Sequence, residues 1–259
     1  MTRRFLPCVV LMASVTSGTL QAQQLAEDSL HLAKATERKD NSHLFEVKKL
    51  IVPAALITYG VFSISNHTVD KLNLSTRYEI NEHKPAKISA DNYTQYAPAA
   101  LVYSLNAFGL KSRHNFKDRT ILLATSQLML SALVVPLKYS IRKERPDGSN
   151  NHSFPSGHTA TAFSTAQFMY REYRSSNRWL SLAGYPFAVF TGVYRTLNNK
   201  HWVGDVAAGA GIGILSTEIS YWMFPKIAKM FRRDKQLSST SFYPYFGNHA
   251  YGIGFVKQL

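Results

Sequence analysis

The chain has 259 residues, enough for one sizeable core or one helical bundle. Its formal net charge of +14 favours anionic partners, such as a membrane surface or a phosphorylated substrate. The basic residues are scattered, mostly at the ends of apolar segments, and form no run with interleaved aromatics, so we expect no nucleic-acid partner. Cys8 is the only cysteine, which excludes a disulfide framework and a thiolate metal site.

Residues 1–22 have the pattern of a secretory signal peptide. Arg3 and Arg4 form a charged start, Phe5 to Val15 is a short apolar stretch, and cleavage is predicted near Ala22. The alternative is an uncleaved membrane anchor, although the apolar stretch is too short to span a bilayer. Residues 23–92 are expected to hold a polar, charged leading segment followed by the first apolar helix.

Six apolar segments follow along the chain, separated by polar or basic stretches: 51–65, 93–110, 120–137, 157–170, 179–194 and 203–224. The segment 120–137 is uncharged and about long enough to cross hydrocarbon. The last segment is rich in small residues that allow close helix approach, namely Ala207, Ala208, Gly209, Gly211 and Gly213. We therefore predict an all-α, antiparallel bundle of about six helices.

The last part of the chain, residues 231–259, is predicted to be a separate tail. Alternating aromatics and glycines between Ser238 and Phe255 suggest one or two short strands there. The main bundle then occupies residues 93–230.

Three clusters of polar residues could carry chemistry. The first holds Lys138 and, seven residues later, Arg145-Pro146; the second is Pro155-Ser156-Gly157-His158; the third is Arg195, His201 and Asp205. Guanidinium groups match phosphate oxygens bidentately. A glycine at a helix start lets backbone N–H groups approach an anion.

The two histidines can exchange protons near neutral pH. Asp205 lies four residues after His201, so its carboxylate can accept one imidazole N–H and leave the other nitrogen as a nucleophile. Because successive helices of an up-and-down bundle alternate in direction, helix counting brings all three clusters to the same end.

The spacing Lys-x6-Arg-Pro, Pro-Ser-Gly-His and Arg-x5-His-x3-Asp resembles the three-part signature of the type 2 phosphatidic acid phosphatase (PAP2) superfamily, over roughly residues 95–225. That superfamily includes lipid phosphatases, bacterial class A acid phosphatases and vanadium haloperoxidases. The resemblance implies a phosphatase without metal or other cofactor. One departure is Tyr194, which stands where the family usually has a serine.

The resemblance also implies roles for these residues. His201 becomes phosphohistidine, Asp205 orients it, and His158 protonates the leaving group and then activates water. Five residues are implied to hold the phosphate: Lys138, Arg145, Ser156, Gly157 and Arg195. Taken singly, each of these has a plain structural explanation, such as a helix-end charge or an ordinary helix start.

The leading hypothesis is a membrane-associated phosphatase of the bacterial envelope, most similar to enzymes of Gram-negative bacteria. Its phosphorylated lipid substrate would be lipid A, undecaprenyl diphosphate or a phosphatidate, and no obligate protein partner is evident. The rivals are a soluble periplasmic acid phosphatase, a haloperoxidase and a noncatalytic lipid-binding protein.

A periplasmic catalytic end raises a question of topology. If the signal peptide is cleaved, an odd number of spans must precede 120–137, whereas two apolar segments precede it. We expect the segment 93–110 not to span. The basic stretches 171–178 and 226–235 would then lie inside, as the positive-inside bias favours.

Overall fold

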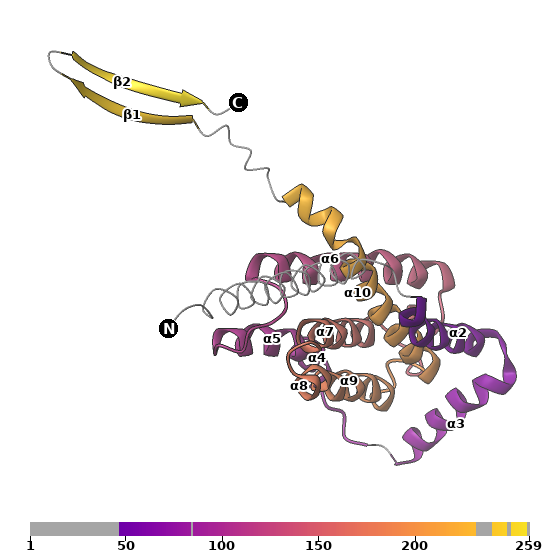
Figure 1. Cartoon of the computed structure of the whole chain (residues 1–259). Helices are drawn as coiled ribbons and strands as arrows, with labels where there is room; N and C mark the ends of the chain where they lie inside the picture. Colours follow the sequence, from indigo (N-terminus) through magenta and orange to yellow (C-terminus); the bar gives the residue numbers. More distant parts are fainter. Residues whose placement is uncertain (1–46, 84, 232–239, 248–249, 258–259) are drawn as a thin grey trace, which may run out of the picture. The chain divides into compact units, whose positions relative to one another are not determined.

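The computed structural model describes residues 47–83, 85–231, 240–247 and 250–257 (Figure 1). The predicted signal peptide lies outside these residues. The described helices are, in chain order, η2 (Val47–Leu50), α2 (Ile51–Ser65), α3 (His67–His83), α4 (Asp91–Thr94), α5 (Ala97–Ala107), α6 (Phe116–Ile141), α7 (Gly157–Tyr173), α8 (Arg178–Leu182), α9 (Tyr185–Leu197) and α10 (Val203–Phe231).

Local sequence explains where the main helices begin and end. α6 starts after Asn115, whose side chain accepts a hydrogen bond from the Asp118 N–H, and it ends at Arg142 in the left-handed conformation (φ 49°). α7 starts after Ser156, which caps the helix through Thr159. These capped boundaries fix where the polar loop of residues 142–156 leaves α6 and enters α7.

α2 runs antiparallel to α10. A Cβ on Gly60, late in α2, would lie 2.6 Å from the carbonyl oxygen of Gly204. A Cβ on Gly211, further along α10, would lie 2.6 Å from the carbonyl oxygen of Pro53, near the start of α2. The end of α2 and the start of α10 therefore lie at the same end of the bundle.

α7 lies between α6 and α10. Lys138 at the end of α6 donates to the Pro155 carbonyl, and Gln127 further back donates to Ser164, so α6 and α7 are antiparallel. Ser156, just before α7, contacts Asp205 at the start of α10, and Ser164 shares a hydrogen bond with Thr217 further along both helices (2.9 Å), so α7 and α10 are parallel. We call the end formed by the last residues of α2, α6 and α9 and the first residues of α7 and α10 the motif end, and the other the opposite end.

The segment from α4 to α5 returns the chain from the motif end. Asp91 pairs with Arg195, and the Gln95 carbonyl accepts from Thr165 in the middle of α7. The carbonyl of Val102 accepts from Tyr173, at the end of α7. The helices α2, α5, α6, α7, α9 and α10 thus alternate in direction, and the predicted all-α antiparallel bundle of about six helices is confirmed.

The segment 93–110, which is expected not to span a membrane, contains α5, which has 11 residues and is only about 16 Å long. Two details of the sequence-based prediction change. The polar stretch 66–92 contains the 17-residue helix α3. The predicted helix 179–194 is divided into α8 and α9.

Close contact between α7 and α10 depends on glycine. A Cβ on Gly209 would lie 2.5 Å from the Ser156 carbonyl oxygen, and a Cβ on Gly213 would overlap the Ala160 carbonyl. The small residues predicted to allow close packing therefore bring the third cluster of residues directly against the second.

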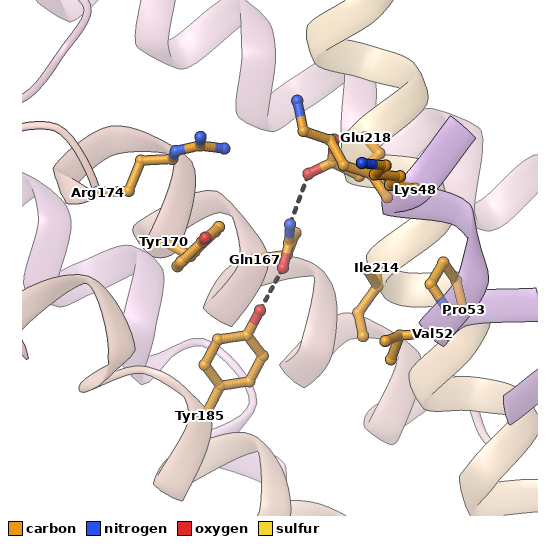
Figure 2. Close-up of a pocket in the computed structure, with 10 residues that line it drawn as sticks. Lys48, Val52, Pro53, Gln167, Tyr170, Arg174, Tyr185, Ile214 and Glu218 are labelled. Carbon is orange, nitrogen blue, oxygen red and sulfur yellow. Dashed lines mark hydrogen bonds between the residues drawn. The ribbon is translucent and has the colours of Figure 1, made fainter. Parts of the chain in front are cut away.

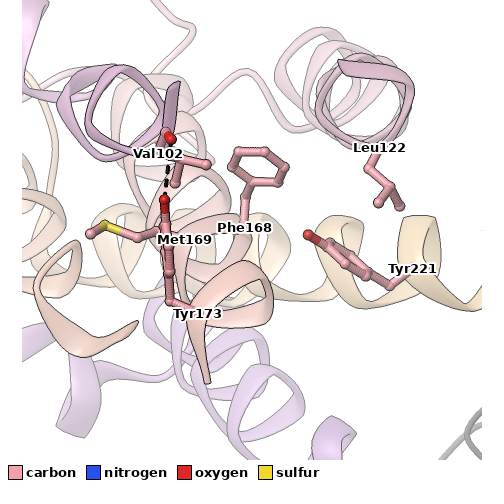
Figure 3. Packing of buried hydrophobic residues seen from close by; sticks show 6 residues of the cluster. All are labelled: Val102, Leu122, Phe168, Met169, Tyr173 and Tyr221. Carbon is pink, nitrogen blue, oxygen red and sulfur yellow. Dashed lines mark hydrogen bonds between the residues drawn. The ribbon is translucent and has the colours of Figure 1, made fainter. Parts of the chain in front are cut away.

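The apolar core extends toward the opposite end. A cluster of buried residues joins α5, α6, α7 and α10 there, as Figure 3 shows: Val102, Leu122, Phe168, Met169, Tyr173 and Tyr221. By contrast, α2 and α6 expose large apolar side chains, and Leu128 is 72% exposed.

Two helical stretches are long and apolar enough to cross a membrane, Val47–Ser65 and Phe116–Ile141. Only 17% and 22% of their most apolar windows is buried within the protein. This differs from the core helix of a soluble protein, which is mostly buried.

The C-terminal part contains a two-stranded antiparallel sheet, β1 (Thr240–Gly247) and β2 (Ala250–Lys257). Thr240 pairs with Lys257, and Gly247 pairs with Ala250. The strands suggested by the aromatic and glycine pattern are therefore present.

Candidate active site

The three sequence clusters meet at the motif end. Lys138 donates to the carbonyls of His152 (2.8 Å) and Pro155 (2.7 Å), which joins the first cluster to the second. The Ser156 N–H donates to the Asp205 carbonyl (3.0 Å), which joins the second to the third. The resulting site lies at the end of α6, the start of α7 and the loop between α9 and α10.

Asp205 is fully buried and strongly hydrogen-bonded. It accepts from the Ser153 hydroxyl, from Lys143 Nζ (3.2 Å) and from the Trp202 N–H (3.1 Å). Burial alone would raise the pKa of this carboxyl, but nearby His201, Lys143 and Ser153 hold it below the ordinary value. Asp205 is therefore a carboxylate at neutral pH.

His201 lies against Asp205 and is 2% exposed. Its Nδ1 is 3.8 Å from Asp205 Oδ2, which is too long for a hydrogen bond, and Nδ1 has no hydrogen-bond partner in the described part of the chain. Burial lowers the pKa of His201 to about 4, with Lys138 and Arg195 acting in the same direction and Asp205 opposing them. The imidazole is therefore neutral near pH 7, as a nitrogen nucleophile must be.

His158, on the first turn of α7, is the second histidine of the site. Burial lowers its pKa to about 4, and the charges of Arg195, Arg145 and Lys138 add to this effect. Its Nε2 lies 3.0 Å from Asn92 Oδ1. A negatively charged ligand among these cations would raise the pKa again.

The two arginines of the site have unsatisfied donors. Arg195 donates through Nη1 to Asp91 (2.8 Å), whereas its Nε and the Nε of Arg145 are buried without a partner in the described residues. Buried donors without a partner are rare in native proteins. Arg119 and Arg171, away from the motif end, also have a buried Nε without a partner in the described residues. What distinguishes Arg145 and Arg195 is that both act on His158 together with Lys138, and this group of cations suits an anionic ligand.

Of the predicted phosphate ligands, Ser156 and Lys138 also hold the local structure together. Ser156 is fully buried, accepts a hydrogen bond from the Thr159 N–H and shares another with the Thr159 hydroxyl. Lys138 uses two of its three donors on the loop carbonyls. Gly157 leaves only ordinary contacts for an added Cβ, 3.9 Å from Lys138 Cε. Ser156 therefore has the structural task of capping an ordinary helix start.

Tyr194 packs rather than hydrogen-bonds. Its ring lies 4.3 Å from the ring of Phe190 between centroids, and no described residue hydrogen-bonds to its hydroxyl.

Sequence reasoning missed four polar residues of the site: Asp91, Asn92, Lys143 and Ser153. Lys143 and Ser153 lie inside the polar loop between the first two clusters, and both hold Asp205. Asp91 and Asn92 come from α4, about a hundred residues before the third cluster. Only their position in a loop between motif residues could have drawn attention to the first two, and no pattern in the sequence marks the other two.

A cavity separate from the three clusters lies toward the opposite end, around Gln167 (Figure 2). Its volume is about 410 Å³. Tyr185 donates to Gln167, which donates to Glu218 (2.6 Å), so its central polar groups are already satisfied. It contains none of the predicted site residues and no histidine, and we do not assign the chemistry to it.

In the described part of the chain, the candidate metal ligands do not include His158, His201 or Asp205. Among the described residues, the group that could hold a metal ion is the exposed set Glu79, Glu82 and His83 on α3. Around His201 the neighbouring charges are mainly cationic, which suits an anion better than a metal ion.

Known proteins match the part of the chain that contains the three clusters. The family model of the PAP2 superfamily matches residues 119–229. The lipid A 1-phosphatase of Porphyromonas gingivalis is 42% identical over 134 residues, which is 51% of this chain and 30% of that protein. The bacitracin transport permease protein BcrC of Bacillus licheniformis is 38% identical over 79 residues, 30% of this chain and 36% of that protein.

Among solved structures, Aquifex aeolicus LpxE aligns with a TM-score of 0.44 at 24% identity, over 57% of this chain and 94% of that one. The chain spans about a third of the length of the two curated relatives. All three clusters, from Lys138 to Asp205, fall inside the matched region. The family model of the PAP2 superfamily thus matches the region that carries the motif resemblance.

Proposed function

We propose that the protein is a metal-independent phosphatase that removes phosphate from a phosphorylated lipid of the bacterial envelope. The observation that carries this proposal is a buried, neutral His201 beside a carboxylate, among cations with unsatisfied donors. The relative named lipid A 1-phosphatase makes the phosphate of lipid A the first substrate to test, ahead of undecaprenyl diphosphate and phosphatidates.

In the first step, Nε2 of His201 attacks phosphorus, the bond to the ester oxygen breaks, and phosphohistidine forms. Asp205 orients the imidazole and stabilises the positive charge that develops on it. Moving Nδ1 closer to Asp205 by about 1 Å would complete their hydrogen bond. Hydrogen bonds of this kind are often long before a ligand binds.

His158 handles the protons in both steps. It gives a proton to the leaving alkoxide, then takes one from the water that attacks the phosphohistidine, which releases inorganic phosphate and restores His201. The incoming phosphate counteracts Arg195, Arg145 and Lys138, the charges that lower the pKa of His158. Substrate binding therefore favours the protonated form that the first step needs.

The cations stabilise the charge of the transition state. The free Nε groups of Arg145 and Arg195 and the third donor of Lys138 are the groups we assign to phosphate oxygens, together with the backbone N–H at Gly157. We assign Ser156 an indirect part, since it is fully buried and caps α7.

A membrane setting is supported by the exposed apolar faces of α2 and α6. With the motif end in the periplasm, Lys48, Lys49 and Arg174 lie at the cytoplasmic end, in keeping with the positive-inside bias. α2 then starts on the cytoplasmic side, together with η2. The soluble acid phosphatase is less well supported, because its surface would carry these apolar helices in water.

The test is phosphate release by the purified full-length chain in detergent, with excess EDTA, from the three lipid classes and from a small aryl phosphate. We expect a kcat/KM at least ~10-fold higher for one lipid, because remote binding energy contributes to catalysis. Vanadate should inhibit, and His201→Ala should be inactive. A strict requirement for added metal would overturn the mechanism, and a clear preference for the aryl phosphate would favour the soluble acid phosphatase.

A further inference from the structure

The four-residue helix α4 lies outside the matched domain but touches both sides of the site. Asn92 Oδ1 is 3.0 Å from Nε2 of His158 on α7. The adjacent Asp91 accepts from Nη1 of Arg195 on α9, at 2.8 Å. Two consecutive residues therefore contact the proposed proton donor and one of the proposed phosphate ligands.

α4 is held firmly in this position. Thr94 shares a hydrogen bond with Thr191 of α9 (2.8 Å), and the Gln95 carbonyl accepts from Thr165 of α7 (2.8 Å). Asp91 is itself buried, at 1% exposed. A segment fixed to both helices can hold catalytic side chains within the narrow tolerance that catalysis requires.

The contact with Asn92 determines how the protons of His158 are arranged. A carbonyl oxygen only accepts, so it selects the form of the imidazole with hydrogen on Nε2 and leaves Nδ1 to exchange the proton. The amide is neutral and so adds no net charge. The charged groups around this imidazole are Arg195 on α9, Asp91 on α4, Arg145 in the loop and Lys138 on α6.

Asp91 acts on Arg195 in a comparable way. By accepting a hydrogen bond from Nη1, Asp91 fixes the plane of the Arg195 guanidinium. The buried Nε of that group remains without a partner in the described residues. The fork is thus oriented before a ligand arrives.

We propose that Asn92 and Asp91 are positioning residues of the active site: Asn92 holds His158 as the proton donor and acceptor, and Asp91 aims Arg195 at the phosphate. This inference rests on the proposed phosphatase function. α4 therefore completes the site from outside the 119–229 domain.

The experiment compares Asn92→Ala, Asn92→Asp and Asp91→Asn with Tyr93→Ala, a control on the same helix whose side chain is 79% exposed. Hydrolysis of a small aryl phosphate is followed from pH 4 to 9. Asn92→Ala should lower kcat by ~10-fold with KM within ~3-fold, since orientation acts on the chemical step. Asp91→Asn should weaken inhibition by vanadate by ~10-fold.

Asn92→Asp gives the sharpest readout, because a carboxylate beside the imidazole favours its protonated form. The alkaline limb of the kcat profile should move up by about one pH unit or more. The titration of His158, followed by NMR on ¹³C-histidine-labelled protein and assigned with His158→Gln, should move in the same direction whether or not the enzyme turns over.

The outcomes separate the two proposals. An inactive wild type whose His158 pKa still rises in Asn92→Asp would overturn the phosphatase function and leave the contact standing. An active wild type in which the three variants match Tyr93→Ala in kcat, pH profile and vanadate inhibition would overturn the role of α4. An unchanged His158 titration in Asn92→Asp would do the same.

Discussion

Two pairs of histidine and carboxylate lie at opposite ends of the bundle. At the opposite end, His114 Nδ1 is 2.7 Å from Glu172, which also accepts from the Tyr221 hydroxyl (2.6 Å). At the motif end, His201 Nδ1 is 3.8 Å from Asp205 and has no hydrogen-bond partner in the described residues. In the first pair the histidine and the carboxylate are hydrogen-bonded to each other. In the second pair Nδ1 of His201 can still form a hydrogen bond.

The carboxylates make the same contrast. The Glu172 carboxylate accepts hydrogen bonds from the ring and from the backbone N–H of His114. It thereby ties the segment that precedes α6 to the helix α7. Asp205 is held by Ser153, Lys143 and Trp202 instead, so its position does not depend on His201. On the proposed mechanism, the first pair contributes stability, whereas the second holds Asp205 in place and leaves His201 able to react.

The largest difference should appear on removing each histidine. His201→Ala should reduce turnover by more than ~10⁴-fold, because it removes the nucleophile. His114→Ala should keep kcat within ~3-fold but lower the free energy of unfolding by about 1–3 kcal/mol, because buried Glu172 loses its partner. Phosphate release and denaturant unfolding measure the two effects. Equal losses of kcat in both variants would abolish the contrast.

Removing the charge of each carboxylate should give the next largest effect. Asp205→Asn should lower kcat by ~10²–10⁴-fold and leave vanadate inhibition within a few-fold, because Asp205 acts through His201. Glu172→Gln should retain kcat and lose about 1–3 kcal/mol of stability. If Asp205→Asn instead loses vanadate binding and keeps a normal single-turnover rate, Asp205 does not orient the nucleophile.

Arginine provides a matched pair as well. Arg195 and Arg171 each hold a carboxylate at 2.8 Å, Asp91 and Glu218 respectively. Arg195→Lys should weaken vanadate inhibition and lower kcat, each by about 10-fold, because lysine loses the planar fork. Arg171→Lys should change neither, although it should reduce stability. Identical kinetics for the two variants would remove Arg195 from the phosphate site.

The pH effect that comes from His201 should be smaller and confined to the acid side, whereas His158 governs the alkaline limb. The pKa of His201 is lowered to about 4, so kcat/KM should fall tenfold per unit only below about pH 4, as the nucleophile becomes protonated. The pKa in the unfolded chain is near 6.5, so the unfolded state binds the proton first. Stability from this group is therefore complete above about pH 6.5 and declines as pH falls toward 4. The acid limb of the kcat/KM profile should be the same in the control variant His114→Ala. An acid limb of the wild-type profile near pH 6.5 would contradict a buried, neutral His201.

The sequence predicted the parts of the molecule that depend on regular spacing. Apolar segments gave the six alternating helices, and helix direction gave the meeting of Lys138, His158 and Asp205 at one end. It did not predict α3, whose polar surface resembles a loop, or the division of the segment 179–194 into α8 and α9. Hydropathy alone carries no information on helix direction.

The site residues that the sequence did not predict escaped notice for a related reason. Asn92 and Asp91 lie in a four-residue helix within a polar stretch, and only folding brings them against His158 and Arg195. The partner of His114 was also hidden, since Glu172 is 58 residues away and belongs to another helix. Short spacing such as His201 to Asp205 can be seen in a sequence, but contacts between distant segments cannot.

The central claim is that His201, the incompletely satisfied histidine, is the group that takes up phosphorus. The most direct measurement is rapid quenching of a single turnover with ³²P-labelled substrate, followed by peptide mapping. The account predicts an acid-labile phosphoenzyme on His201, absent from His201→Ala and slower to form in Asp205→Asn. Label on His158 or any other residue, or turnover by His201→Ala with a normal phosphoenzyme, would contradict it.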